Sequence, residues 1–176
     1  MLDIKQFNER FLFELKHAAL FDRRAACISF ALDPVLVDIV AETSDLNLSR
    51  LASNECTLVR QNFCSSILVP SSSGMATTSQ LTAIQLLNYE YLMLVRHIAV
   101  KNVREAMLRT GVEYAAADRL GKLAACDIQG LVKYGECMIG KCHLTPKAVK
   151  TAVSEFSLPS CITMLSMRNR SELCLR

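Results

Sequence analysis

The residues best suited to metal chemistry lie close together in the stretch CMIGKCH. Cys137, Cys142 and His143 are ligand types that Zn²⁺ prefers, but a structural zinc site needs four ligands, and its cysteines usually come in pairs two to four residues apart. None of the eight cysteines forms a CxxC pair, and Cys56 and Cys64 are too widely spaced to supply an obvious second pair beside Cys137 and Cys142. The sequence therefore favours small, reduced cysteines over a zinc site, and we expect no metal and no other cofactor.

Residues for acid–base or nucleophilic catalysis form no known arrangement. The chain lacks a phosphate-binding Walker loop, a GxSxG nucleophile elbow and an HExxH metal motif. The three histidines are His17, His97 and His143. His17 and His97 occupy the same place in two similar stretches of the chain, which favours a repeated structural role over two active sites. We expect no enzymatic activity.

Positive charge gathers in the second part of the chain. Residues 1–76 carry seven Lys/Arg against nine Asp/Glu, whereas residues 77–176 carry thirteen against eight. Clustered basic side chains are typical of contacts to nucleic-acid phosphates, and a solvated face is the alternative. The candidate DNA-contacting residues are Lys133, Lys141, Lys147 and Lys150.

The composition favours helices as the elements that position these residues. The chain of 176 residues is 51% hydrophobic, enough for a sizeable core, and it has few of the glycines and prolines that a β-sandwich needs in its turns. The most apolar region, LTAIQLLNYEYLMLVRHIAV, is interrupted by Asn88, Glu90 and Arg96, so we expect no membrane-spanning helix. We expect an all-α protein in the cytoplasm.

Two stretches of the chain are similar when they are aligned at a fixed offset. FLFELKHAALFDRRAACISFAL begins at Phe11, and YLMLVRHIAVKNVREAMLRTGV begins at Tyr91. Several positions are identical in this alignment, and the order of helix-breaking residues is the same in both halves. This pattern predicts a tandem repeat of one helical unit. The boundaries follow from it: a first unit over 1–68, a linker over 69–79, a second unit over 80–144, and a C-terminal helix and tail over 145–176.

Helix caps predict four helices in each unit. In the second unit we expect a long helix from about Ser79 to Val100, a short helix between Asn102 and Gly111, a third over 113–123, and a fourth that Asp127 caps. In the first unit the long helix is expected to begin near Asp3. There Asp22 takes the place of Asn102, Asp33-Pro34 begins the third helix, and Asn47 takes the place of Asp127.

The two long helices carry apolar residues at spacings of three and four, the pattern of a helix–helix seam. Each is apolar over too much of its circumference to be covered by its own small unit alone. We therefore predict that the long helices pair in an intramolecular pseudo-dimer, with each helix simply central in one core as the alternative. The predicted interface consists of Ile4, Phe7, Phe11, Ile84, Leu87, Tyr91, Leu94 and Ile98.

The second unit resembles the FlhD family, the helical subunit of the bacterial flagellar master transcription activator. The resemblance lies in NYEYLMLVRHIAVKNVREAMLRTGV and the following LGKLAACDIQGLVKYGECMI, within Leu86 to Leu144, and the first half is a weaker match. The resemblance implies an all-α protein that dimerises through intertwined long helices. It also implies a zinc-binding partner, FlhC, with which FlhD binds promoter DNA of flagellar or related genes.

The chain departs from the FlhD pattern in having the unit twice, with a linker and an added tail. These departures leave the stoichiometry and the partner open. The rival interpretations are a helical interaction protein or secretion chaperone that does not bind DNA, and a cysteine-based redox or metal protein.

Overall fold

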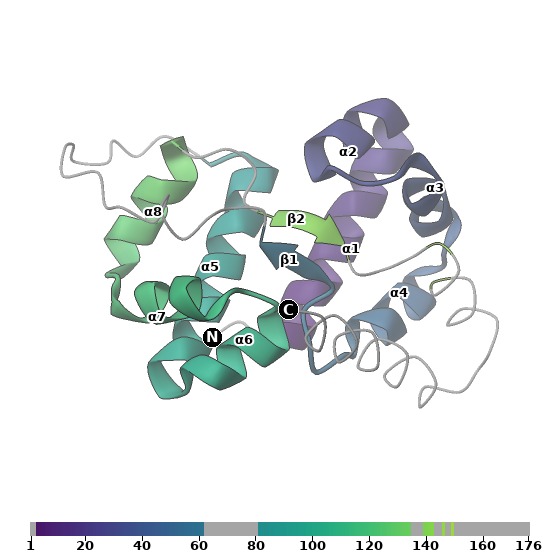
Figure 1. Cartoon of the computed structure of the whole chain (residues 1–176). Helices are drawn as coiled ribbons and strands as arrows, with labels where there is room; N and C mark the ends of the chain where they lie inside the picture. The colour runs from purple at the N-terminus through teal and green to yellow at the C-terminus, as the bar shows by residue number, and fades with distance from the viewer. Residues whose placement is uncertain (1–2, 62–80, 135–138, 143–145, 147–148, 150–176) are drawn as a thin grey trace.

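The computed structural model describes residues 3–61, 81–134 and 139–142, together with Pro146 and Val149, and it is predominantly helical (Figure 1). Helices α1–α4 form one group, which we call the first unit, and α5–α8 form another, the second unit. Two short strands lie between the two units (Figure 1). The helical fold class predicted from the sequence is confirmed.

The first unit begins with a long helix that three short helices follow. Its helices are α1 (Ile4–Phe21), α2 (Arg23–Phe30), α3 (Pro34–Glu42) and α4 (Asp45–Ala52). Each helix starts after a residue whose side chain accepts a hydrogen bond from a free backbone N–H of the first turn: Asp3, Asp22, Asp33 and Ser44. These caps fix the helix boundaries locally.

The second unit has the same order of one long and three short helices. They are α5 (Ala83–Lys101), α6 (Val103–Thr110), α7 (Tyr114–Lys122) and α8 (Ala125–Tyr134). Thr82 caps α5, and Asn102 both ends α5 and caps α6. Gly111 ends α6 in the left-handed conformation, with φ of 70°. The order of helices predicted for both units therefore agrees with the structure.

Three predicted helix starts were wrong. Helix α5 begins after Thr82 rather than at Ser79, which lies outside the described residues. Helices α4 and α8 begin before Asn47 and Asp127. The Asn47 backbone N–H donates to the Ser44 side chain, and the Asp127 carboxylate accepts from the Ala124 N–H, so both residues occupy the third helical position of a capping arrangement. The residue type alone does not distinguish this third position from the cap.

The two strands were not predicted from the sequence. Strand β1 (Val59–Gln61) pairs antiparallel with β2 (Ile139–Cys142), with Val59 opposite Cys142 and Gln61 opposite Ile139. Strand β1 follows the first unit and β2 follows the second, so this ribbon joins the ends of the two units. Runs of three and four residues are too short for an alternating pattern to reveal them.

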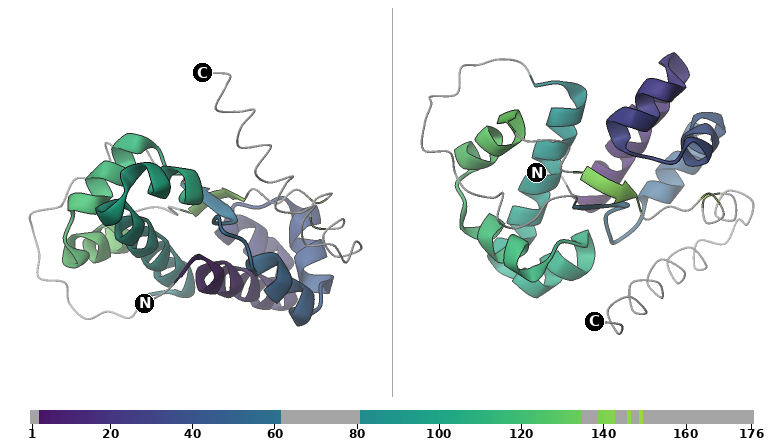
Figure 2. Two further views of the ribbon diagram at one scale, coloured as in Figure 1. Left: turned by 90° about the horizontal axis from the view of Figure 1, so that it is seen from below. Right: turned by 45° about the horizontal axis from the view of Figure 1, so that its top comes forward.

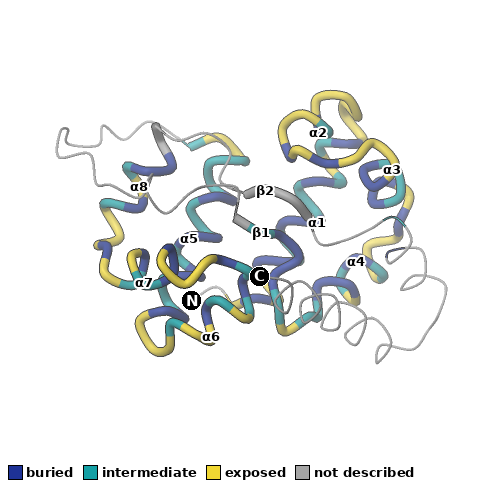
Figure 3. The backbone as a smooth tube through the Cα atoms, viewed as in Figure 1, coloured by how far each residue is buried: buried dark blue, intermediate teal, exposed yellow. Residues whose placement is uncertain are grey.

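The core is continuous across both units. Helix α1 packs mainly against α2, α3 and α4, and α5 packs mainly against α6, α7 and α8 (Figure 2). Much of α1 and α5 is buried, whereas α2 is largely exposed (Figure 3). The buried residues of both units belong to one apolar cluster. Within the described residues, no helix is both long and apolar enough to cross a membrane.

The predicted unit boundaries stay predictions. The whole predicted linker, 69–79, and most of the predicted tail, 145–176, lie outside the described residues. Pro146 and Val149 in that tail are both helical. The predicted helix after Thr145 lies mostly outside the described residues and stays a prediction.

Candidate functional site

The two units meet at a contact region that we call the junction. It consists of the crossing of α1 and α5, the segment 55–61 that follows α4, and the C-terminal turn of α6. The junction is the region where the structure brings predicted interface residues from distant parts of the sequence together.

At the centre of the crossing, an aromatic side chain from each long helix makes contact. The ring centroids of Phe7 and Tyr91 lie 5.7 Å apart with an angle of 39° between their planes, and both side chains are fully buried. Aromatic pairs in such offset arrangements contribute beyond the burial of their surface. The Tyr91 hydroxyl donates a hydrogen bond to the Thr110 carbonyl (2.9 Å), which satisfies its polar end.

The other predicted interface residues are also mostly buried, but not all of them face the opposite unit. Ile84 is only half-buried, whereas Ile4, Leu87, Leu94 and Ile98 are buried. Phe11, also buried, stacks edge-on against Phe30 of its own unit, with centroids 5.7 Å apart.

Asn8 fixes the segment that leads from α4 into β1. Its side-chain amide donates to the carbonyls of Ala52 (3.3 Å) and Cys56 (3.0 Å), and its carbonyl accepts from the Leu58 N–H (2.9 Å). The Asn8 side chain is fully buried. Because a buried backbone group without a partner is costly, this one amide holds the segment 52–58 in place against α1.

The same segment provides hydrogen-bond donors to the backbone carbonyls in the C-terminal turn of α6, in the second unit. The last carbonyls of a helix have no partner within the helix. The Thr57 N–H donates to the Arg109 carbonyl (2.8 Å), and the Thr57 hydroxyl lies 3.2 Å from the Thr110 carbonyl oxygen. Both threonines are buried. The first unit therefore terminates a helix of the second unit, which couples the two units through the backbone.

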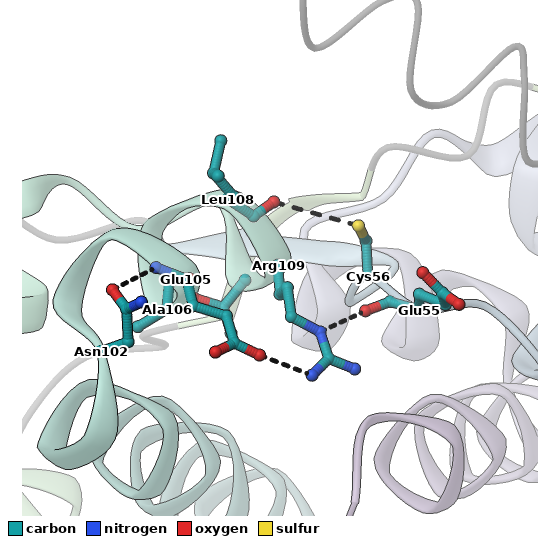
Figure 4. Close-up of polar contacts among 8 residues, drawn as sticks. Glu55, Cys56, Asn102, Glu105, Ala106, Leu108 and Arg109 are labelled. Carbon is teal, nitrogen blue, oxygen red and sulfur yellow. Dashed lines mark hydrogen bonds and ion pairs between the residues drawn. The ribbon is translucent and has the colours of Figure 1, made fainter.

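Arg109 adds a polar contact at the edge of the junction (Figure 4). Its Nε donates to the Glu55 carbonyl (3.0 Å), and its Nη1 forms an ion pair with Glu105 one turn earlier in α6 (3.1 Å). The nearby Cys56 thiol lies 3.9 Å from the Leu108 carbonyl oxygen. Burial raises the pKa of the Cys56 thiol, although the Arg109 guanidinium acts in the opposite direction. A raised pKa favours the neutral thiol over the reactive thiolate.

An ion pair joins the two long helices next to the aromatic contact. Arg10 of α1 and Glu90 of α5 approach to 2.5 Å, and their side chains are 39% and 15% exposed. Burial raises the pKa of Glu90 because it disfavours the charged form, Arg10 lowers that pKa, and the nearby carboxylate of Glu14 raises it.

The side chains of all four predicted DNA-contacting lysines lie outside the described part of the chain. Lys133 is in the last turn of α8, and Lys141 is in β2 beside the junction. Lys147 and Lys150 are not among the described residues. DNA contact by these four residues stays a prediction.

The stretch that could hold zinc is also mostly outside the described residues. Cys137 and His143 are not described, and of Cys142 only its place in β2 is known. Among the described residues, no three His, Cys, Asp or Glu side chains are grouped closely enough to bind a metal ion.

Several large apolar side chains are exposed at matching places in the two units. Leu20 and Val100, in the last turns of α1 and α5, are 65% and 60% exposed. Ile28 and Leu108, at the same positions of α2 and α6, are 73% and 56% exposed, and Phe21 is 95% exposed.

The polar residues of the junction were not predicted from the sequence. One signal was available: in the alignment that sets Phe11 on Tyr91, Arg10 aligns with Glu90 and Asn8 aligns with Asn88. The first pair of positions carries opposite charges, and the second carries the same amide in both units. Such polar residues on otherwise apolar helix faces indicate buried polar contacts. No comparable signal pointed to Thr57 or Arg109, whose partners are backbone groups.

The comparison with protein families connects this geometry to function. Residues 75–158 match the model of the family described as Flagellar transcriptional activator (FlhD). This part of the chain belongs to the FlhD family. The matched range contains α5–α8 and β2 and includes the stretch in which the sequence resembles FlhD. Neither a comparison with curated proteins nor one with solved structures finds a significant match.

The FlhD match assigns the second unit to a family of transcription regulators and not to a family of enzymes. It does not include residues 1–74. The origin of the first unit as a duplicate of the FlhD-like unit therefore stays a prediction, although its helices have the same order and nearly the same lengths.

Proposed function

We propose that this protein is an FlhD-like transcription regulator that acts with an FlhC-like partner at promoter DNA of flagellar or related genes. The FlhD family match over residues 75–158 is the observation that carries this proposal. The junction supports it, because the FlhD-like unit is joined to a second helical unit through long helices within one chain. We infer that the first unit supplies the contacts that a second FlhD subunit makes in a dimer.

The DNA contacts are proposed to come from the basic C-terminal region. Acidic residues outnumber basic ones by two over 1–76, whereas basic residues outnumber acidic ones by five over 77–176. Phosphates would therefore be repelled by the first unit and attracted by the second unit and the tail. The lysines proposed for this role are Lys133, Lys141, Lys147 and Lys150.

A gel-shift titration at several salt concentrations tests this proposal with the full chain and its FlhC-like partner. The variant Lys147→Glu/Lys150→Glu should bind promoter DNA more weakly at all sequences, and the log–log slope against salt should flatten by about one unit for each lost contact. The control Lys5→Glu/Arg24→Glu makes the same change in net charge on two exposed positions of the first unit, and its affinity should be unchanged. Equal affinity in all three proteins would contradict the proposed DNA contacts.

The second candidate function is a helical interaction protein or secretion chaperone that does not touch DNA. The exposed apolar residues support it, because Leu20 and Val100, and Ile28 and Leu108, recur at matching places in both units. Co-purification of an FlhC-like partner with DNA binding by the complex would favour the regulator. Stable binding of another protein, without any gel shift in the presence of an FlhC-like partner, would favour the second candidate.

A further inference from the structure

Arg10 and Glu90 occupy the same place in their respective units. The separation along the chain between Arg10 and the helix cap Asp22 equals the separation between Glu90 and the helix cap Asn102. The crossing of α1 and α5 thus sets two corresponding positions against each other, and one holds a cation where the other holds an anion.

The carboxylate of Glu90 depends on this cation. Its side chain is only 15% exposed, and its Oε2 is buried without a hydrogen-bond partner among the described residues. The nearby Glu14 carboxylate repels it. Arg10 is the one described cationic group whose charge opposes these two effects. Removing the cation would leave a mostly buried charge unpaired, which is strongly unfavourable.

The apolar part of the crossing does not distinguish the two units from each other. Phe7 corresponds to Leu87, and Phe11 corresponds to Tyr91, so either unit presents large apolar side chains at these places. A first unit facing another first unit would still bury apolar surface. It would, however, place Arg10 against a second Arg10, and two second units would place Glu90 against a second Glu90.

We propose that the Arg10–Glu90 ion pair selects the partner at this surface. The α1 face of the first unit fits a helix with an acidic residue at the place of Glu90, and each unit rejects a second copy of itself through like-charge repulsion. Specific interfaces commonly combine an attractive contact with such a penalty for the wrong pairing. The ion pair therefore directs the two units of one chain to each other and limits self-association through α1 or α5. This inference does not depend on DNA binding.

Charge exchange in the full chain tests the pairing itself. Arg10→Glu should lower the melting temperature by about 8 °C, because three carboxylates then meet at the crossing. Glu90→Arg should lower it less, by about 4 °C, because Glu14 remains near the new cation. The double variant Arg10→Glu/Glu90→Arg should return to within about 2 °C of the unmodified chain.

A matched control separates this effect from a general change in charge. Arg23 pairs with Asp38 within the first unit at 2.9 Å, and the two side chains are 60% and 43% exposed. Arg23→Glu makes the same charge change as Arg10→Glu, but it should shift the melting temperature by less than about 2 °C, as expected for an exposed pair.

Partner choice is tested by refolding two variants together. In a mixture of Arg10→Glu and Glu90→Arg chains, each variant has like charges at the crossing within its own chain and opposite charges only toward the other variant. After joint unfolding and refolding, light scattering coupled to size-exclusion chromatography should show several-fold more dimer in the mixture than in either variant alone. The unmodified chain should show no such increase.

Two results would overturn the inference. One is a double variant as unstable as Arg10→Glu, which would mean that the two side chains do not act as a pair. The other is a mixture with no more dimer than the separate variants, which would mean that the ion pair stabilises the junction without choosing the partner.

Discussion

The first and second units share most of their helix boundaries but differ in the side chains at several corresponding positions. Helix α2 ends at Ala31 with φ of 51°, and α6 ends at the corresponding Gly111 with φ of 70°. Both residues are left-handed, yet only glycine adopts this conformation without a steric penalty. The α2 and α6 helices thus end in the same backbone conformation even where the residue type does not favour it. The caps give both units the same helix order, while the side chains at several corresponding positions differ.

A second difference lies on the long helices. Leu94 of α5 is buried with 4% exposure, and the corresponding residue of α1 is Glu14, which is half-buried. At this position α1 therefore accommodates a charged side chain, whereas α5 buries an apolar one. Exchanging the two residue types is the strongest way to test this difference.

Leu94→Glu should have the largest effect on stability. The change places a carboxylate in the core, and we expect a loss of about 4 kcal/mol in the free energy of unfolding. The reverse change, Glu14→Leu, should cause no loss, because it removes a carboxylate that repels Glu90. Urea unfolding followed by circular dichroism measures both. Similar losses in the two variants would show that the two positions are equally sensitive to charge.

Asn8→Ala should have the next largest effect. The change leaves the Ala52 and Cys56 carbonyls and the Leu58 N–H without the partners that the Asn8 side chain provides, so we expect a loss of about 3 kcal/mol. Asn88, at the corresponding position of α5, is also buried, with 3% exposure. Amide hydrogen exchange of Leu58 should accelerate in the Asn8 variant. Unchanged exchange would contradict the role of Asn8 in holding segment 52–58.

Exchanging the residues at the two left-handed positions should produce smaller effects of opposite sign. Ala31→Gly should stabilise the chain by about 1 kcal/mol because it relieves the strain of a left-handed alanine, and Gly111→Ala should destabilise it by about 1 kcal/mol. Thermal unfolding of both variants checks this prediction. Equal signs for the two changes would mean that α2 and α6 do not end in the same way.

The smallest expected effect is the pH dependence of the ion pair. Because the folded-state pKa of Glu90 is raised above its ordinary value of 4.5, the folded chain binds this proton more tightly than the unfolded chain does. The contribution of Glu90 to stability therefore falls as the pH rises from 4.5 through the folded-state pKa. Glu90→Gln removes this dependence, so the variant should gain stability relative to the unmodified chain between pH 4 and pH 7. Urea titrations at both pH values measure the difference, and a constant difference would contradict the raised pKa.

Much of the fold could be predicted because helix starts and ends are encoded locally. Asp3, Asp22, Asp33 and Asn102 were identified as caps from their residue types and spacing, and each caps the expected helix. The errors at Asn47 and Asp127 arose because Asp and Asn also occur at the third helical position. There the Asp127 carboxylate reaches back to the Ala124 N–H, and the Asn47 backbone N–H donates to the Ser44 cap.

The junction could be predicted only in part. Apolar periodicity indicated Phe7 and Tyr91, which do make contact. The hydrogen bonds of Thr57 to the end of α6 depend on where the chain runs after α4, and no residue pattern encodes that path. The ion pair between Arg10 and Glu90 depends on the angle at which two helices cross, which spacing along one helix does not determine.

The central claim is that the two units of one chain pack against each other. The most direct test is to measure whether Phe7 and Tyr91 are in contact within a single chain. Chains labelled for nuclear magnetic resonance at both Phe and Tyr should show nuclear Overhauser effects between these two rings, whose centroids lie 5.7 Å apart, and a Phe7→Leu variant assigns the signals. A refolded mixture of chains labelled only at Phe with chains labelled only at Tyr should not show them. Absence of the signals in the doubly labelled chain, or equal signals in the mixture, would contradict the packing of the two units within one chain.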